Sequence, residues 1–379
     1  MYSYYNPVRI YFGSEEINSL SKTLEKEGLK YNKLLLLTGK SSLKRSGVLD
    51  KLLQQFNSSE VLLYDDIASN PDISDLLSVK QRTDDFDYDM IIAVGGGSVI
   101  DTGKSLAALR TMKACNKSDI RKIITERAYL LNSNKCKLIA VPTTAGTGSE
   151  VTSWATIWDK EYNNKYSIED PALYPYIAVL DPGLTIYLPL KLTVTTSLDA
   201  LCHATEAYWS KRTSEIVRGY ALNAINKIIT NIPGILCDPQ SIRIREKLLE
   251  GSLMAGLAFS NTKTTACHSI SYPLTLMYGI DHGVAASITL GKLLEINSAQ
   301  IIERDRLLKA FGVEQVCEVQ DKLAAIYDLA KLPRLLRDYG VPRDAIIDIA
   351  KHSFTPGRMD NNPVDLKLED MIDLLNSIY

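Results

Sequence analysis

Residues 89–101 read DMIIAVGGGSVID and decide the fold. The almost wholly apolar run Met90–Val94 is typical of a strand buried on both faces of a parallel sheet. Three glycines follow, and a helical pattern begins near Ser98. Glycine lets a backbone approach phosphate oxygens closely, and a helix N-terminus offers unpaired N–H groups. The stretch predicts a phosphate-binding strand–turn–helix; the alternative is a tight turn without a ligand. It departs from the ordinary dinucleotide fingerprint, because position 100 is Ile rather than Gly.

A second loop of this kind, PTTAGTGSE at 142–150, follows the apolar strand predicted over 137–141. It combines small residues, hydroxyl groups and backbone donors. Two such loops at the carboxyl ends of parallel strands predict a dinucleotide lying over that edge of the sheet.

The first half of the chain alternates strand and helix patterns. Strands are predicted at 8–12, 33–37 and 60–64, and helices at 15–27, 41–56 and 73–83. This alternation predicts βαβ units in a doubly wound sheet. Alternation from Trp154 to Asp181 suggests a hairpin with arms in SWATIWD and YIAVLDP.

Long helical periodicities run from about residue 196 to the end. We expect breaks at Pro233, Pro239, Pro273, Pro333 and Pro342. The predicted architecture is an α/β dinucleotide-binding domain over 1–185 and an all-helical domain over 186–379.

The composition argues against several classes of protein, namely nucleic-acid-binding, membrane-spanning and disulfide-rich proteins. The 379 residues are 45% hydrophobic and 23% charged, and 43 Lys+Arg against 45 Asp+Glu give a net charge of −2. That balance offers no basic excess for nucleic acid. No apolar run approaches the roughly 18 residues of a membrane span. The start, MYSYYNPVRI, lacks a signal-peptide pattern, and six scattered cysteines suggest no disulfide framework. We expect a cytoplasmic enzyme with reduced thiols.

The chain has only four histidines, which makes each one informative. Asp199 and His203 are spaced i, i+4 and share a face of a predicted helix. His268 and His282 lie in the same half of the chain. One carboxylate and three imidazoles suit Fe²⁺ or Zn²⁺ with open positions for a substrate oxygen. A purely structural role is the alternative for each, and we interpret His352 as a surface histidine.

The end of the second strand bears on cofactor choice. An acidic residue there would bind the ribose 2′-OH of NAD(H), but the sequence has Gly39 followed by Lys40, Lys44 and Arg45. Room and positive charge favour NADP(H) over NAD(H). Alternatively, these cations simply solvate a helix face.

Taken in order, GGGSVID, PTTAGTGSEVT, DALCHATEAYW and the two later histidines resemble the iron-containing (group III) alcohol dehydrogenases over essentially the whole length. The resemblance implies a dehydroquinate synthase-like fold, with the active site between a nucleotide-binding domain and a helical metal-binding and substrate domain. A homodimer is frequent in the family. The implied metal ligands are Asp199, His203, His268 and His282. The implied cofactor contacts are Gly39, Asn70, Gly96, Gly97, Ser98, Val99, Ile100, Asp101, Thr143, Thr144, Thr147 and Lys165.

Three departures from the family pattern concern the substrate. The family commonly has GLG before the third ligand and a further histidine four residues after it; here these are Lys263-Thr264-Thr265 and Tyr272. Tyr272 or water would then relay the alcohol proton. Arg358 occupies a pocket-lining position four residues before Asn362-Pro363.

The cations Lys263 and Arg358 favour a phosphonate, phosphate or carboxylate substrate, because the Arg fork can bind two oxygens at once. The alternative is that they pair with acids such as Asp281 or Asp360. The segments NTKTTACHSISYPLT and GRMDNNPVDL look most like the phosphonoacetaldehyde reductase branch, whose members form 2-hydroxyethylphosphonate.

The implied reaction is reversible hydride transfer between the nicotinamide C4 and an aldehyde carbon, with the metal as Lewis acid. Three other functions stay open. They are a general short- or medium-chain alcohol or glycerol dehydrogenase, a dehydroquinate-synthase-like lyase, and an inactive dinucleotide-binding protein.

Overall fold

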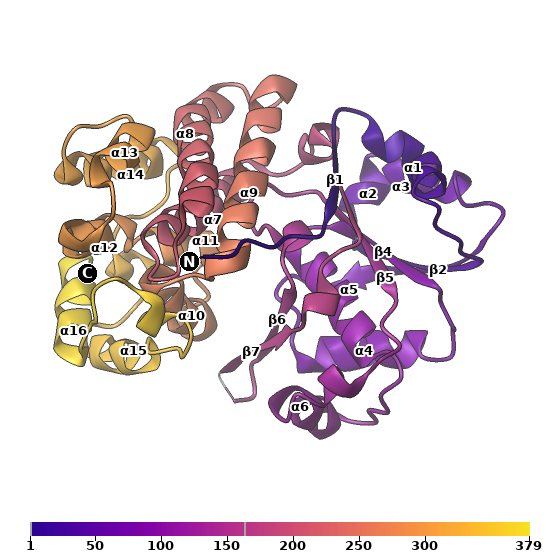
Figure 1. The fold of residues 1–379 in the computed structure, drawn as a ribbon. Coiled ribbons are helices and arrows are strands. Elements are labelled where there is room, and N and C mark those ends of the chain that lie inside the picture. Colours follow the sequence, from indigo (N-terminus) through magenta and orange to yellow (C-terminus); the bar gives the residue numbers. More distant parts are fainter. Residues whose placement is uncertain (1, 163) are drawn as a thin grey trace. The chain divides into compact units, whose positions relative to one another are not determined.

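The computed structural model describes residues 2–162 and 164–379. The chain forms two compact units, whose elements are labelled in Figure 1. One unit comprises 6–144 and 149–188. The other comprises 189–379, the N-terminal residues through Tyr5 and the short segment 145–148. The sequence placed a single division near 185, whereas the loop segment 145–148 groups with the helical unit.

The first unit is built on a six-stranded sheet whose strand pairs are all parallel, in the order β1-β8-β5-β4-β2-β3. The strands are β1 (Arg9–Phe12), β2 (Lys33–Gly39), β3 (Glu60–Ile67), β4 (Met90–Gly95), β5 (Lys137–Pro142) and β8 (Ile177–Leu180). Strands β4 and β5 are neighbours, and Gly95 pairs with Pro142. The two glycine loops therefore leave the same edge of the sheet side by side.

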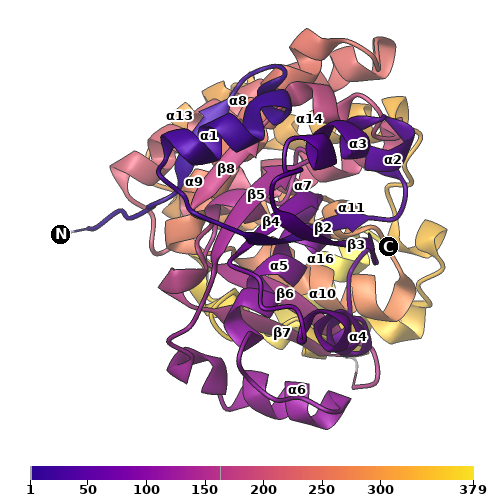
Figure 2. The ribbon, with the colours of Figure 1, turned by 90° about the vertical axis from the view of Figure 1, so that its right-hand side faces the viewer.

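Alternate residues of the central strands face two cores. Leu35, Leu37 and Ile91 pack with α4 (Ile73–Thr83), α5 (Gly97–Leu109) and α6 (Lys117–Thr125). Leu34, Leu36 and Ile92 pack with α1 (Leu20–Lys26) and α3 (Val48–Gln54) on the opposite face. Figure 2 shows these helices on the two sides of the strands. Burial on both faces explains why these strands read as continuous apolar runs.

The predicted hairpin was wrong in its second arm. Strand β6 (Trp154–Asp159) pairs antiparallel with β7 (Asn164–Glu169), whereas Ile177–Leu180 is β8, between β1 and β5 in the main sheet. All four residues of β8 are buried, which is the pattern of a central strand rather than of a hairpin arm.

Two helices predicted as continuous are divided. The stretch 41–56 forms α2 (Ser42–Arg45) and α3, because Gly47 between them takes the left-handed backbone conformation at φ 70°. The stretch 15–27 begins as a 3₁₀ turn, Glu16–Ser19, before α1. Helix α6 was not predicted.

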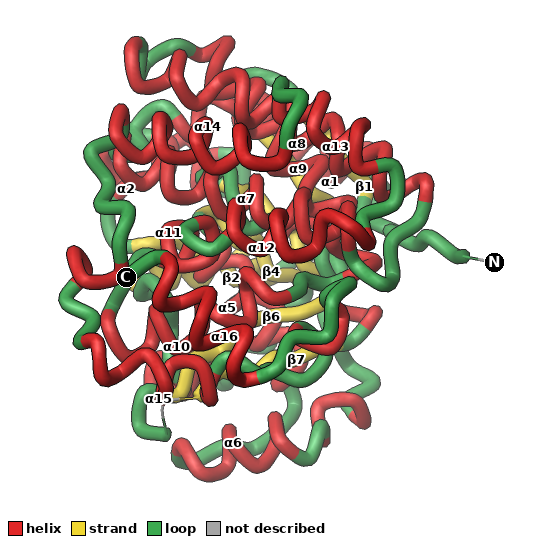
Figure 3. Tube along the Cα trace, turned by 90° about the vertical axis from the view of Figure 1, so that its left-hand side faces the viewer, coloured by secondary structure: helices red, strands yellow, loops and turns green. Residues whose placement is uncertain are grey.

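The second unit contains helices and loops but no strand in its described residues (Figure 3). Its helices are α7 (Leu190–Trp209), α8 (Glu215–Cys237), α9 (Ile242–Thr262), α10 (Ala266–Tyr278), α11 (His282–Ser287), α12 (Leu290–Asn297), α13 (Arg304–Phe311), α14 (Val316–Leu329), α15 (Ile346–His352) and α16 (Leu368–Ser377). Helices α7, α8 and α9 pack against one another. None of the described helices is long and apolar enough to cross a membrane.

Two of the predicted proline breaks were wrong. Pro233 lies inside α8 and Pro273 inside α10, whereas Pro239, Pro333 and Pro342 lie outside the α-helices. Proline costs about 3 kcal/mol inside a helix through its missing N–H and its steric clash. Buried residues on both sides, such as Ile232 and Ile235 around Pro233, show that packing outweighs this local cost.

Candidate active site

Helix α7 supplies two of the predicted metal ligands. Asp199 and His203 lie one turn apart on it, and every residue from Ser197 to Trp209 is buried. A helix enclosed on all sides can hold a carboxylate and an imidazole away from water. Asp199 is only 4% exposed.

Three of the four predicted ligands converge. One donor atom each from Asp199, His268 and His282 lies within 4.8 Å of the others. Oδ1 of Asp199 is 3.3 Å from Nε2 of His268 and 3.9 Å from Nε2 of His282. The set joins α7, α10 and α11, so residues 83 positions apart in sequence form one cluster of donors.

The fourth predicted ligand, His203, lies beside this set. Its Nδ1 is 4.0 Å from Oδ2 of Asp199, and its ring stacks on His268 and on Phe259 at centroid distances of 4.3 and 4.1 Å. Burial lowers the pKa of His203 to about 3, so the ring is neutral. Nδ1 is buried without a hydrogen-bond partner among the described residues. A buried nitrogen of this kind is a suitable ligand for a cation.

His268 lies between two carboxylates. Its Nδ1 faces Oε2 of Glu206 and its Nε2 faces Asp199. Burial disfavours a charged ring, but the carboxylates outweigh it and raise the pKa of His268 well above its usual value. Burial likewise opposes ionisation of Asp199, but His203 and the other imidazoles hold the pKa of that carboxyl well below its usual range.

This arrangement fits a divalent metal. Glu206 only accepts hydrogen bonds, so when the ring of His268 is neutral its N–H lies on Nδ1 and its lone pair on Nε2. That lone pair then faces another acceptor, Asp199, at 3.3 Å. A cation bound by both atoms removes the conflict. One carboxylate oxygen with neutral imidazoles is a donor set suited to Fe²⁺ or Zn²⁺.

Gly283 allows α11 to approach α7. A Cβ atom on this residue would lie 1.8 Å from the backbone oxygen of Thr195 and 3.1 Å from Cβ of Asp199. Only glycine fits at this distance, and the preceding residue is the predicted ligand His282. Neither Gly283 nor Glu206 was singled out from the sequence, although both lie within four residues of a predicted ligand.

The first glycine loop joins β4 to α5 as predicted. A Cβ on Gly95 would lie 2.4 Å from Val99, and one on Gly96 would lie 3.2 Å from Thr144 of the second loop. The loop contains Gly97 and Ser98 and continues into Val99 and Ile100, which are buried. The backbone N–H of Asn70 donates to the Ser98 hydroxyl at 3.0 Å. The predicted cofactor residues Asn70, Gly96, Ser98 and Thr144 therefore lie together, with Thr143 bonded through its N–H to the oxygen of Gly95.

Asp101 connects this region to the hairpin. Its carboxylate accepts hydrogen bonds from the Ser149 hydroxyl at 2.5 Å and from the Thr156 N–H at 2.9 Å. Burial raises the pKa of Asp101, and the charges of Lys104 and Lys165 oppose that rise. The sequence assigned Asp101 to the pyrophosphate; in the structure its carboxylate is engaged by protein donors. Lys165 lies on β7.

Lys104, which the sequence reasoning missed, is buried beside Asp101. Its ammonium donates to the hydroxyls of Ser149 and Thr152 at 3.0 Å each and to the backbone oxygen of Trp154 at 2.9 Å. Burial lowers its pKa to about 8. Glu150 is buried nearby, and burial raises its pKa to about 7. The spacing of Asp101 and Lys104 on α5, i and i+3, was a signal that could have been used.

The glycines of the second loop have a packing role. Gly148 has a left-handed backbone, and a Cβ on it would lie 2.6 Å from Cα of Gly256 on α9. A Cβ on Gly146 would lie 2.6 Å from Cβ of Thr196 on α7. Thr147, between them, belongs to the helical unit. Close helix packing therefore explains these two glycines without a phosphate.

The cations near the second strand form exposed ion pairs. Lys40 pairs with Asp66 at 3.1 Å, and Lys44 pairs with Asp65. A Cβ on Gly39 would meet nothing within 4 Å. The two lysines therefore form surface ion pairs, which is the alternative given for them from the sequence.

The residues predicted to contact the substrate are Tyr272, Lys263 and Arg358. The ring of Tyr272 is parallel to that of His282, with centroids 6.1 Å apart. Lys263 ends α9 in the left-handed region at φ 63°. Arg358 is 9% exposed and donates to the Gly357 carbonyl at 3.2 Å. Asp281, one acid considered for these cations, pairs instead with Lys191 at 2.9 Å.

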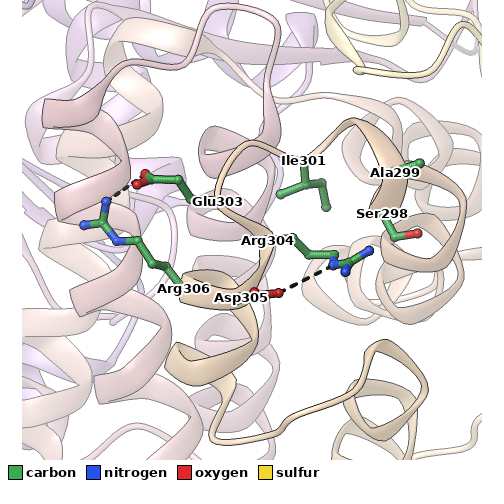
Figure 4. A pocket seen from close by; sticks show the side chains of 7 residues that line it. All are labelled: Ser298, Ala299, Ile301, Glu303, Arg304, Asp305 and Arg306. Atoms are coloured by element: carbon green, nitrogen blue, oxygen red, sulfur yellow. Dashed lines mark hydrogen bonds and ion pairs between the residues drawn. The ribbon is translucent and has the colours of Figure 1, made fainter.

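A separate surface hollow of about 530 Å³ lies around the start of α13 (Figure 4). It is lined by Ser298, Ala299, Ile301, Glu303, Arg304, Asp305 and Arg306. Glu303 and Arg306, which line this hollow, form an ion pair at 2.7 Å. His352 lies elsewhere, at the end of α15, and is exposed, as predicted. None of the residues proposed for catalysis lines this hollow.

Fold and site together define a nucleotide-linked, metal-dependent oxidoreductase. The family model for iron-containing alcohol dehydrogenases matches residues 7–182, and that for the C-terminal part of the same family matches 193–379. The chain belongs to the iron-containing alcohol dehydrogenase family. It is an NAD(P)-linked, iron-dependent alcohol or aldehyde oxidoreductase.

Relatives with different substrates match the chain. It is 28% identical to an NADPH-dependent butanol dehydrogenase of Clostridium saccharobutylicum, over 98% of this chain and 97% of that one. It is 33% identical to a phosphonoacetaldehyde reductase of Streptomyces viridochromogenes, over 76% of this chain and 75% of that one. The crystal structure of sulfoacetaldehyde reductase from Bifidobacterium kashiwanohense in complex with NAD⁺ matches with a TM-score of 0.88 and 27% identity, over 100% and 98%.

Proposed function

We propose that this enzyme reduces a small aldehyde carrying an anionic tail, with phosphonoacetaldehyde as substrate and 2-hydroxyethylphosphonate as product. The observation that carries this proposal is the burial of Arg358 without an ion-pair partner among the described residues. This side chain is 9% exposed, and within the described part of the chain it makes no ion pair. A buried cation without an anion is costly, and a bound phosphonate would neutralise it.

The segment carrying Arg358 is tied to the turn carrying Lys263. The Asn361 side-chain amide donates to the backbone oxygens of Thr262 at 2.8 Å and Thr264 at 3.1 Å. These two carbonyls flank Lys263. The same segment is joined to the residue after His268, because the Thr355 N–H donates to the Ser269 hydroxyl at 3.0 Å. Hydrogen bonds therefore connect the segment that carries Arg358 both to the turn that carries Lys263 and to the helix that carries the proposed ligand His268.

The backbone at Lys263 supports a role for its side chain. A non-glycine residue at φ 63° and ψ −179° adopts a conformation that favours glycine and costs of the order of 1–3 kcal/mol. The family commonly has glycine in this stretch. A strained lysine in place of glycine is consistent with a substrate that needs its charge.

The proposed metal ligands are Asp199, His203, His268 and His282. When bound, the metal supplies a Lewis acid for the carbonyl and the nicotinamide supplies the hydride. Arg358 and Lys263 bind the anionic tail and orient the aldehyde. Tyr272, stacked near His282, or water supplies the proton that completes the alcohol.

We propose NADP(H) as the preferred cofactor. The open space at Gly39 leaves room for a 2′-phosphate, and exposed pairs such as Lys40–Asp66 contribute little and exchange readily for a phosphate. Equilibrium titration by nicotinamide fluorescence tests this: NADPH should bind at least tenfold more tightly than NADH, and Gly39→Asp should reverse the order. Equal affinities in the wild type would contradict the preference.

The substrate is tested with Fe²⁺-loaded protein and NADPH, by comparing kcat/KM for phosphonoacetaldehyde and propionaldehyde. We expect a preference of about a hundredfold, which corresponds to ~2.7 kcal/mol of transition-state binding. Arg358→Met should remove most of it while leaving propionaldehyde turnover within about threefold. Equal turnover of both aldehydes in the wild type would instead support a general alcohol dehydrogenase.

Sulfoacetaldehyde is a second candidate, because the match to a sulfoacetaldehyde reductase covers the whole chain. A sulfonate is a monoanion, whereas two cations suit a dianion better. Sulfoacetaldehyde belongs in the same assay, and a higher kcat/KM for it than for phosphonoacetaldehyde would reassign the substrate.

A further inference from the structure

Glu206 lies on α7, one turn beyond His203, and is fully buried. Its two oxygens have separate partners. Oε1 accepts hydrogen bonds from the Thr265 N–H at 3.1 Å, the Thr265 hydroxyl at 2.8 Å and the His268 N–H at 3.3 Å. Oε2 faces Nδ1 of His268.

The first set of contacts caps a helix from outside. Helix α10 begins at Ala266, and its N-cap residue, Thr265, makes no side-chain capping bond. The first N–H groups of a helix lack partners within the helix. Oε1 of Glu206 satisfies two of the N–H groups there, those of Thr265 and His268. A carboxylate also interacts favourably with the helix N-terminus. Glu206 thereby fixes the first turn of α10, which carries His268.

The second contact determines which nitrogen of His268 is available. A carboxylate oxygen only accepts, so it places the ring N–H on Nδ1. The lone pair is then on Nε2, which points toward Asp199 at 3.3 Å. A carboxylate behind a ligating histidine is known to orient the ring and to raise its basicity.

We propose that Glu206 is a positioning residue that selects Nε2 of His268 for the metal and holds its ring by capping α10. This inference rests on the proposed metal site. Glu206 donates no atom to the metal itself; it acts only through His268.

Glu206→Gln separates the two roles. Three donors converge on Oε1, so the amide oxygen takes that place and the amide NH₂ group faces Nδ1. The cap is retained, but the NH₂ group donates to Nδ1 and moves the ring N–H to Nε2, where it blocks the metal. Glu250→Gln is the matched control, because it neutralises a carboxylate on α9 that is paired with Lys227 and Lys247.

The experiment is Co²⁺ titration of the metal-free proteins by visible absorption, with thermal unfolding measured before metal is added. For Glu206→Gln we expect a melting temperature close to that of the wild type and a Co²⁺ affinity lowered about 10- to 100-fold. Glu250→Gln should bind Co²⁺ normally. Wild-type affinity in a folded Glu206→Gln variant would overturn the inference.

Asp199→Asn distinguishes this failure from failure of the metal site. If Asp199→Asn binds Co²⁺ as well as the wild type does, or the wild type binds none, the proposed site and the role of Glu206 both fall. Should Glu206→Gln not fold, ¹⁵N NMR of the histidines in the Zn²⁺-loaded wild type gives the answer. A His268 N–H on Nδ1 supports the proposal, and one on Nε2 overturns it.

Discussion

Nε2 of His268 lies 3.3 Å from Oδ1 of Asp199, and both residues are buried. The other nitrogen of the same ring is already held by Glu206. An imidazole placed between two acceptors needs either a second proton or a cation. The donor set suits a divalent cation, and the family indicates that this cation is iron.

Gly283→Ala should disrupt the metal centre. The new Cβ would lie 1.8 Å from the Thr195 backbone oxygen, so α11 must shift and take His282 with it. We expect a loss of about 1–3 kcal/mol in the free energy of unfolding, and a lower metal content by elemental analysis. Gly219→Ala, where a Cβ would meet nothing within 4 Å, is the control and should be neutral or slightly stabilising. A Gly283→Ala variant with normal stability and a full metal load would show that this close approach is not required.

Lys263→Gly should make the protein more stable and its substrate preference smaller. Glycine adopts φ 63° without strain, so the free energy of unfolding of the metal-free protein should rise by about 1 kcal/mol. The preference for phosphonoacetaldehyde over propionaldehyde should fall about tenfold, as one of two cations is lost. Chemical denaturation and steady-state kinetics measure the two effects. An unchanged preference would remove Lys263 from the substrate site.

Lys104→Met should destabilise the α/β unit strongly. It removes the cation from a buried site that holds the carboxylate of Asp101, and an uncompensated buried charge costs about 3–5 kcal/mol. Urea unfolding measures the loss. Lys117→Met, which breaks an exposed pair with Glu161, should cost less than about 1 kcal/mol. Similar effects of the two substitutions would refute a special role for the buried lysine.

Glu150 should make stability depend on pH. Its pKa is about 7 in the folded protein against a usual value of 4.5, so the folded state binds more protons between these values. The stabilisation from this group is present below pH 4.5 and is lost as the pH rises through 7, by about 3 kcal/mol in all. In Glu150→Gln this decline should disappear, and the variant should be more stable than the wild type at pH 8. Parallel pH profiles of the two proteins would contradict the assignment.

The α/β half could be predicted from sequence because its strands, such as Met90–Val94, are buried on both faces and read as apolar runs. The hairpin was misassigned because Ile177–Leu180 is a short strand whose hydrogen-bonded neighbours are distant in sequence. It pairs with β1 and β5 in the main sheet, and no local pattern indicates this. Pro233 and Pro273 were read as helix breaks because local propensity was weighed without tertiary packing.

The proposed metal ligands stood out in the sequence because histidine is rare in this chain and Asp199 and His203 share a helix face. The structure brings donor atoms of Asp199, His268 and His282 together. The residues that shape the site could not. Glu206 acts on a helix that begins 60 residues later, and Gly283 matters through its distance from Thr195. Spacing along one helix does not report such contacts between helices.

The most direct test of the account is to remove the metal. Protein stripped with a chelator and then titrated anaerobically with Fe²⁺ should be assayed for bound iron and for NADPH oxidation with an aldehyde. We predict no turnover without metal, and activity that rises in proportion to iron and levels off at about one ion per chain, as expected for a single Lewis-acid site. Full activity in the metal-free protein would contradict the account.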